Sequence, residues 1–563
     1  MIYHCEDHTC NYWDEGEKLP ERCPQCGRKL LRANEADMTG DDWTALGNTL
    51  WDAEASDKKR MVDCFRKAAY LGSAWGVCNL GICMEQGNGV EADPVQAFWL
   101  YQQAVEMGSL NAVCCLGVCY EYGIGTAPDA EKAAELYCKA AEYGSPRGQM
   151  LLAHAFHDGI GVEADAAEAV HWVRAAAYQR YGEGMYRLGV CYEYGDGVEQ
   201  NWEHAVHWFR EAAESGVSAA MTDLGYCYEK GCGVEQSWEQ AFSWYRRGAE
   251  CGYPVSMSNL GLCYKRGYGV EQNWQEAVKW YEQGAQCGHL QSMDNLAYCY
   301  EYGEGVEQNE ERALYWYRRG AEAGSDYCMY CLGWNYSNGE GVEQNMTEAI
   351  RWYTAAAEGG NADAMHDLGW LYDHGEGVEQ DMKKAICWYE RAAEQNHPAA
   401  MNSLGECYAM GRGVPRDLET AMEWYRRAAE LGEAMADYNM GWHLEQAGKL
   451  SEAYAHYRKA ADGNDDSAWW ALGRFYENGV VVAQDGKEAR RCYETGEKLG
   501  SVKCKMRLAR CKLLGIGGRR AKKAGLDLCR QALELAKESS EKEDYGYEAE
   551  MNLLRRTIAE NES

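Results

Sequence analysis

A repeat of 36 residues runs through most of this chain. Its clearest mark is a leucine–glycine pair, which stands at Leu224-Gly225 and returns at Leu260-Gly261. Further copies, some with Met for Leu or Ala for Gly, begin at Leu80, Leu116, Leu152, Leu188, Leu296, Leu332, Leu368, Leu404 and Met440, and looser ones at Leu46, Leu472 and Leu508. Self-similarity at this period is typical of solenoids, in which each repeat packs against its neighbours. A single repeating core therefore replaces the several domains that 563 residues would otherwise suggest.

Each copy of the repeat predicts two helices joined by a glycine loop. In the copy from 217 to 252, one face of the first helix gathers Ala220, Leu224, Gly225, Cys227 and Tyr228. Glycine inside a helix costs about 1 kcal/mol relative to alanine, so its recurrence after the leucine predicts close packing by a neighbouring helix. The loop that follows has the form GxGV, and its glycines suit the positive φ of a helix C-cap and turn.

The second helix starts at an N-cap residue, which is Ser237 in this copy. Such side chains accept hydrogen bonds from the free N–H groups of the first helical turn. The other copies place Asp or Asn there, at Asp93, Asp129, Asp165, Asn201, Asn273, Asn309, Asn345, Asp381 and Asp417. One face of this helix then combines small and aromatic residues, namely Ala241, Trp244, Tyr245, Gly248 and Ala249. Because a helix of about 14 residues is marginal alone in water, we expect stacking of neighbouring repeats to stabilise it.

This pattern resembles the Sel1-like repeat, a relative of the tetratricopeptide repeat. The residues that carry the resemblance are Ala220, Leu224-Gly225, Tyr228, Gly231, Gly233-Val234, Ala241, Trp244-Tyr245 and Ala249. The resemblance implies an all-α fold, a right-handed α/α superhelical solenoid of about fourteen helix pairs. We expect this array to span residues 37–520, with a C-terminal helical cap over 521–563. It also implies a non-enzymatic scaffold or adaptor for protein–protein interaction.

Residues 1–33 stand apart from the array. They contain a CxxC knuckle followed by glycine and, before it, a second and more widely spaced cysteine pair. Four thiolates suit a tetrahedral Zn²⁺ ion, and so short a segment needs such a link in order to fold. We therefore expect one structural zinc ion bound by Cys5, Cys10, Cys23 and Cys26, with His8 as an alternative to Cys10.

The cysteine segment also resembles the rubredoxin-like metal-binding domain of rubrerythrins, with Tyr12, Gly16 and Pro20 at matching places. That family can hold iron for electron transfer. The resemblance therefore implies an alternative function, a metal or redox protein that uses the N-terminal cysteine cluster. The wider spacing of the first cysteine pair and the lack of a recognisable di-iron domain favour zinc over iron.

The composition limits the classes of partner that the protein can bind. A formal net charge of −33 and a pI near 4.9 argue against binding to nucleic acid or to an anionic membrane surface. They favour a basic protein partner or simply a solvated acidic surface. No apolar run approaches the roughly 20 residues that span a bilayer. No secretory signal precedes the 26 cysteines, so we expect a reducing, cytoplasmic location and cysteines that act as small buried apolar residues.

Partner binding is expected on the face of the first helices opposite their apolar stripe. In several copies the position before the leucine holds a polar residue, as at Asn259, Asn295 and Asp367. The position two after the leucine holds an aromatic residue at Tyr226, Tyr298, Trp334, Trp370 and Trp442. A concave groove with this polar and aromatic lining could bind an extended or helical peptide. Alternatively, the aromatic residues fill the gap between adjacent first helices. A hydrolase is disfavoured, because the histidines share no register and have no nucleophile partner, among them His154, His157, His171, His204, His207 and His366.

Overall fold

The computed structural model describes residues 2–5, 13–15, 30–32, 38–51, 55–542 and 547–562. The chain forms two compact units, unit 1 (Met1–Ser292) and unit 2 (Met293–Ser563). One helix, α15 (Leu290–Tyr302), contains the boundary between them.

Unit 1 begins with a small antiparallel sheet. The central strand β1 (Ile2–Cys5) pairs with β2 (Trp13–Glu15) on one side and with β3 (Leu30–Arg32) on the other. These strands are an addition to the all-α fold that the repeats predict. Cys5 ends β1, whereas Cys10, Cys23, Cys26 and the alternative ligand His8 lie outside the described residues. The zinc site therefore stays a prediction.

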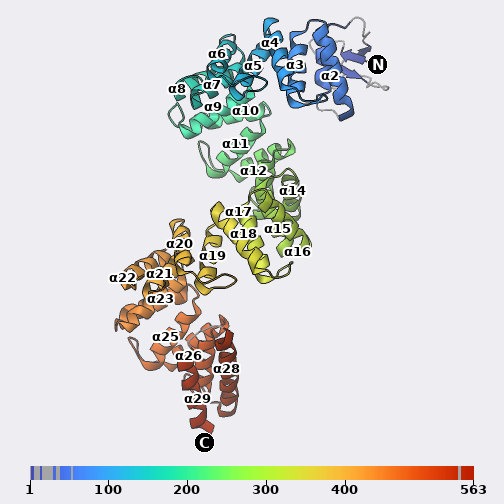
Figure 1. Ribbon diagram of the computed structural model, residues 1–563. Coiled ribbons are helices and arrows are strands. Elements are labelled where there is room, and N and C mark those ends of the chain that lie inside the picture. Colours follow the sequence, from blue (N-terminus) through green and yellow to red (C-terminus); the bar gives the residue numbers. More distant parts are fainter. Residues whose placement is uncertain are drawn as a thin grey trace. The chain divides into compact units, whose positions relative to one another are not determined.

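The rest of unit 1 is built from helices that follow one another in pairs (Figure 1). They are α1 (Gly40–Thr49), α2 (Ala55–Tyr70), α3 (Ala74–Gln86), α4 (Pro94–Glu106), α5 (Leu110–Tyr122), α6 (Ala130–Glu142), α7 (Pro146–Asp158), α8 (Ala166–Tyr178), α9 (Gly182–Tyr194), α10 (Trp202–Glu214), α11 (Ser218–Lys230), α12 (Trp238–Glu250), α13 (Pro254–Arg266) and α14 (Trp274–Gln286).

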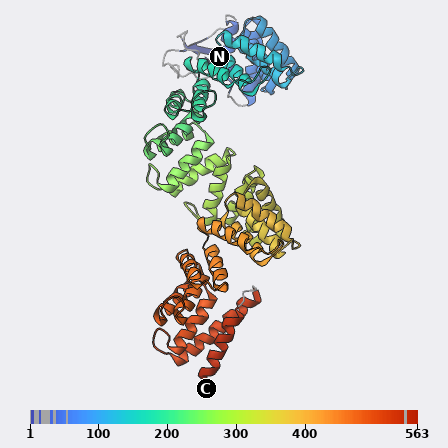
Figure 2. The ribbon, with the colours of Figure 1, turned by 90° about the vertical axis from the view of Figure 1, so that its left-hand side faces the viewer.

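Unit 2 continues the same arrangement, with each helix beside its successor in the chain (Figure 2). Its helices after α15 are α16 (Glu310–Glu322), α17 (Asp326–Asn338), α18 (Met346–Gly359), α19 (Ala362–His374), α20 (Met382–Glu394), α21 (Pro398–Met410), α22 (Leu418–Glu430), α23 (Ala434–Gln446), α24 (Leu450–Asp462), α25 (Asp466–Asn478), α26 (Gly486–Lys498), α27 (Val502–Leu514), α28 (Lys522–Lys542) and α29 (Glu548–Glu562).

In the described part of the chain, α1 to α28 make fourteen consecutive pairs, and α29 follows them. The odd-numbered helices are the first helices of the repeats and the even-numbered ones the second. First helices of successive pairs contact each other, as α5 and α7 do in unit 1 and α25 and α27 do in unit 2. The predicted solenoid of repeated helix pairs is confirmed.

The predicted helix ends are also confirmed. The side chain of Asn201 accepts a hydrogen bond from the backbone N–H of His204 at 3.0 Å, and Ser237 accepts one from Gln240 at 3.3 Å. Asp and Asn cap the other second helices in the same way, from Asp93 to Asp417. Gly231 ends α11 in the left-handed conformation, with φ at 76°. Local sequence therefore sets where these helices start and stop.

In most copies, the glycine after the repeat leucine is explained by a buried tyrosine, and at Gly189 by the ring of Phe209. A Cβ atom on Gly225 would lie 2.6 Å from Cε1 of Tyr245, which is closer than van der Waals contact allows, and Tyr245 itself is buried. The same pairing of a first-helix glycine with a second-helix tyrosine occurs at Gly81 and Tyr101, Gly117 and Tyr137, Gly261 and Tyr281, Gly369 and Tyr389, and Gly405 and Tyr425. The close helix packing predicted from this glycine is confirmed, and its partner is the tyrosine ring.

The recurrent cysteines lie in the core, as expected for small apolar residues. Cys83, Cys119, Cys227, Cys263, Cys299, Cys407 and Cys511 are buried, whereas Cys191 is partly exposed. Within the described ranges, no helix has both the length and the apolar character needed to cross a membrane.

Candidate interaction surface on the first helices

Most of the aromatic residues predicted to bind a partner are exposed. Trp334 on α17 and Trp370 on α19 expose 45% and 40% of their surface, and Tyr226 and Trp442 are exposed as well. Tyr298 is only partly exposed and its ring lies 4.6 Å from that of Tyr302, on the same helix. The exposed part of each ring is accessible to a partner, and binding by these residues stays a prediction.

The polar residues beside them are partly buried. Asn259 lies on α13 and Asn295 on α15. Asp367 accepts a hydrogen bond from the hydroxyl of Tyr330, on the preceding first helix, at 3.2 Å. This hydrogen bond links α17 to α19, so one acceptor oxygen of Asp367 is already bound within the chain.

Three of the predicted residues come together in one pocket of unit 2. Trp334, Asp367 and Trp370 line a pocket of about 260 Å³, which we call the Trp370 pocket. The other lining residues are Ser337, Asn338, Tyr353, Leu371 and Glu376. By contrast, Tyr226 and Asn259 belong to unit 1, and Asn295, Tyr298 and Trp442 are not part of this lining.

A larger pocket of about 580 Å³ lies next to it, between α15 and α17, and we call it the Glu301 pocket. Trp334 belongs to both pockets. The further lining residues are Glu301, Tyr302, Gln308, Glu310, Ala313, Tyr327, Tyr330, Cys331, Asn335 and Glu340. No Lys, Arg or His is among the described residues that line either pocket, so the surface shared by α15, α17 and α19 is acidic as well as aromatic.

Glu301 is a partly buried residue of this acidic surface. Its carboxylate accepts a hydrogen bond from the hydroxyl of the buried Tyr317 at 2.7 Å. Burial raises the pKa of Glu301 above its usual value, because a charged carboxylate loses solvation there. The negative charge of Glu301 in turn raises the pKa of the neighbouring Tyr302.

The bond between Tyr317 and Glu301 belongs to a series that the sequence analysis missed. The same bond joins Tyr101 to Glu85, Tyr137 to Glu121, Tyr245 to Glu229 and Tyr493 to Glu477, at 2.6 to 2.9 Å. In each case the glutamate stands five residues after the repeat leucine and the tyrosine sixteen residues later. This recurrence was visible in the sequence, but only the structure shows that the two side chains meet.

A third pocket, in unit 1, holds two of the histidines. It has a volume of about 390 Å³, and its lining combines aliphatic residues such as Val170 and Val173 with charged ones and with His154 and His157. His157 contacts Asp196 at 3.2 Å, and His154 contacts Asp158 at 3.1 Å. Across the described residues, no group of three or more His, Cys, Asp or Glu side chains is arranged to hold a metal ion.

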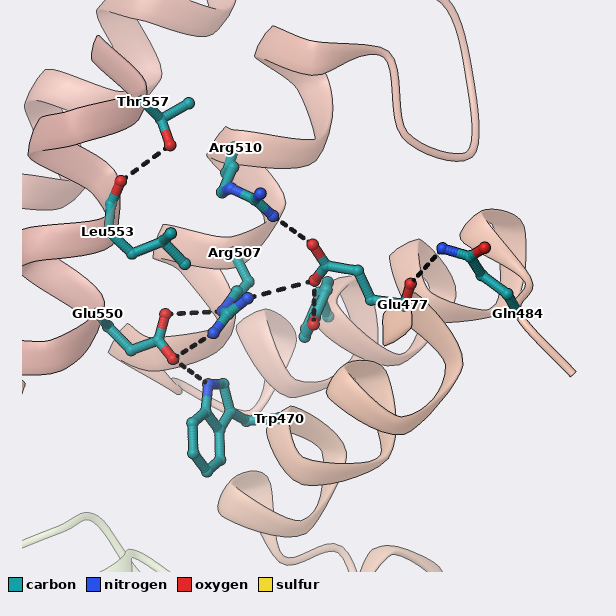
Figure 3. Close-up of polar contacts among 9 residues, drawn as sticks. Trp470, Glu477, Gln484, Arg507, Arg510, Glu550, Leu553 and Thr557 are labelled. Atoms are coloured by element: carbon teal, nitrogen blue, oxygen red, sulfur yellow. Dashed lines mark hydrogen bonds and ion pairs between the residues drawn. The ribbon is translucent and has the colours of Figure 1, made fainter. Parts of the chain in front are cut away.

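At the end of unit 2, residues at the same repeat positions bind the chain itself (Figure 3). Arg507 stands one residue before Leu508, and its guanidinium donates to the carboxylate of Glu550 on α29 at 2.7 Å. Arg507 also lies 3.4 Å from Glu477 on α25, and Arg510 pairs with Glu477 as well. Trp470 donates from its indole N–H to Glu550 at 3.3 Å. First-helix positions in this chain can therefore hold a helix through its carboxylates.

Comparison with known proteins identifies the repeat. The family described as Sel1 repeat matches residues 76–109, 112–145, 146–181, 182–217, 218–253, 254–289, 290–325, 326–361, 362–397, 398–433, 434–465 and 468–501. Among curated proteins, no match was found.

Two solved structures are similar to this chain. One is a protective antigen of uropathogenic Escherichia coli strains that displays an SLR fold. It is 29% identical, with 76% of this chain and 94% of that chain covered and a TM-score of 0.57. The other is a Sel1 repeat protein from Oxalobacter formigenes, which is 28% identical, with 58% of this chain and 92% of that chain covered and a TM-score of 0.44.

Proposed function

This chain belongs to the Sel1 repeat family, and from that premise we propose that it is a non-enzymatic scaffold or adaptor for a protein partner. Sel1 repeat proteins generally act as protein–protein interaction scaffolds. We place the binding surface on the first helices α15, α17 and α19 of unit 2. The right-handed coiling of the array and the concave position of this face stay predictions.

The observation that carries this proposal is the position of Trp334. Its exposed indole ring is shared by the Glu301 pocket and the Trp370 pocket. Large aromatic side chains that line adjoining pockets are typical anchors of protein interfaces. An extended or helical segment of a partner could occupy both pockets around Trp334. The acidic lining favours a basic segment and disfavours nucleic acid and anionic membranes.

Co-purification from the native cells tests this surface. We expect the double variant Trp334→Ala, Trp370→Ala to lose its partner, because both anchors are removed, while its helical circular dichroism stays unchanged. The matched control is Trp75→Ala, Trp99→Ala, which removes two exposed tryptophans of unit 1 and should retain the partner. Retention by the first variant, or equal loss by both, would contradict the proposal.

We also propose that Cys5, Cys10, Cys23 and Cys26 bind one structural Zn²⁺ ion, with iron as the less favoured metal and His8 as the alternative ligand. The chemistry of four closely spaced thiols supports this assignment. A reducing, cytoplasmic location belongs to the same proposal, since it would keep these thiols available to the metal. A redox function would use the same cysteines but would require iron.

A further inference from the structure

Four aromatic residues from two helices line the Glu301 pocket, namely Tyr302 on α15 and Tyr327, Tyr330 and Trp334 on α17. Tyr302 ends α15, Tyr327 lies in the first turn of α17, and Trp334 follows two turns later. Tyr302 and Tyr327 expose 59% and 38% of their surface. These rings therefore present aromatic surface to the solvent instead of completing a core, and the face of an aromatic ring attracts cations.

Three carboxylates from different elements complete the lining. Glu301 lies on α15, Glu310 opens α16, and Glu340 lies in the loop after α17. Glu340 and Glu310 are exposed, whereas Glu301 is partly buried. The pocket thus gathers three carboxylates and no cation among its described lining residues, which favours a positively charged group of a partner.

Elsewhere on this protein, an arginine of the chain often lies over a buried or partly buried aromatic ring. Arg319 lies 5.2 Å from the ring centre of Trp316, Arg391 lies 4.4 Å from that of Trp388, and Arg427 lies 4.5 Å from that of Trp424. In the described lining of the Glu301 pocket, the aromatic rings have no such cation beside them. The aromatic and acidic residues of this pocket could therefore bind a cation that another molecule supplies.

We propose that the Glu301 pocket binds the ammonium group of a lysine side chain carried by the partner, an inference that rests on the interaction surface proposed above. Lysine fits better than a quaternary ammonium group because its three N–H donors can reach carboxylates from three elements. The aromatic walls then pack against its aliphatic stem. Glu301 accepts a hydrogen bond from Tyr317, but no cationic side chain among the described residues lines the pocket beside it.

Isothermal titration of the full-length protein tests this pocket with a defined probe, the blocked peptide acetyl-(Gly-Lys)₃-amide. We expect binding of this peptide, weaker binding of the trimethyllysine version, and none of the version with neutral norleucine. Glu340→Gln and Tyr302→Leu should each lower the affinity for the lysine peptide by about three- to tenfold. This is the range expected for loss of one ion pair or one cation–π contact. Both residues are exposed, so the fold should tolerate these changes.

The control for nonspecific attraction to an acidic protein is Glu343→Gln. This residue is exposed in the same loop as Glu340, carries the same charge and does not line the pocket. It should change the affinity by less than about twofold, as for a distant surface charge. Equal weakening by the Glu340 and Glu343 variants, or equal affinity for the norleucine peptide, would overturn the inference.

Failure of this inference can be told apart from failure of the proposed function. If partner capture depends on Trp334 and Trp370 while the lysine peptide fails these tests, the interaction surface stands and the lysine pocket is rejected. If partner capture is indifferent to both tryptophans, the proposed function is rejected, and with it the premise of the lysine pocket.

Discussion

Gly233 and Gly252 both have positive φ values, 69° and 84°, but their surroundings differ. A Cβ atom on Gly233 would lie 2.4 Å from the carbonyl oxygen of Trp202, in the preceding repeat. At Gly252, a Cβ atom would have no heavy atom within 4 Å. Backbone conformation alone therefore requires glycine at position 252, whereas position 233 is also a point of contact between repeats.

This difference predicts unequal effects of alanine at the two sites. Gly252→Ala should cost about 1 to 2 kcal/mol, the strain of a left-handed alanine. Gly233→Ala should cost more, because the methyl group also pushes against the backbone of the neighbouring repeat. The measurement is urea unfolding followed by circular dichroism at one protein concentration. Equal urea midpoints of unfolding for the two variants would show that the contact with Trp202 adds nothing to the free energy of unfolding.

Helix α29 is held in unit 2 by ion pairs that solvent barely reaches. The side chains of Arg507 and Glu550 are 13% and 8% exposed, and that of Glu477 is 9% exposed. Removing one partner from such a protected pair is costly because the other charge stays shielded from water. The contacts of Figure 3 thus bind α29 to α25 and α27 of the same chain.

Glu550→Gln is expected to loosen this helix. Loss of a protected charge partner costs about 3 to 5 kcal/mol, so amide hydrogen exchange in α29 should become faster while exchange in α23 stays unchanged. The control is Glu488→Gln, which breaks a solvent-exposed pair with Arg491 at 3.7 Å and should cost less than about 1 kcal/mol. Unchanged protection of α29 in the first variant would mean that apolar packing alone holds the helix.

Helix positions in this chain follow from local sequence, and this is why they could be predicted. The N-caps at Asn201 and Ser237 and the C-cap glycine at Gly231 act within one turn of their own helix. The strands β2 and β3 have three residues each. Such short segments contain too little alternation for a strand to be predicted from sequence.

At the scale of the whole molecule, metal content tests the N-terminal assignment. Purified protein should contain one zinc and no iron by elemental analysis, and it should be colourless. Cys23→Ser, Cys26→Ser should lose the metal, because two of the four thiolates are removed. The helical circular dichroism should be almost unchanged, since the array from α1 to α29 lies outside residues 1–33. An iron-loaded protein with a reversible redox couple would support the redox alternative instead.

The sequence by itself determined the architecture, because its determinants repeat and act over short distances. The 36-residue period predicted the helix pairs, and the N-cap and C-cap residues predicted where the helices begin and end. The glycine of Leu224-Gly225 indicated a close helix contact, which Tyr245 makes. It also placed Trp334 and Trp370 on the exposed face of their helices. A side chain's face on a helix follows from its position relative to the repeat leucine.

Only the tertiary structure decided which of these residues line a common pocket. Trp334 and Trp370 line a common pocket, whereas Trp442, at the equivalent repeat position, does not line it. The difference arises because a pocket also needs walls from other elements, such as Tyr353 on α18 and Glu340 in a loop. Helical periodicity relates residues within one helix, but the distances between side chains of different helices and loops are set by packing.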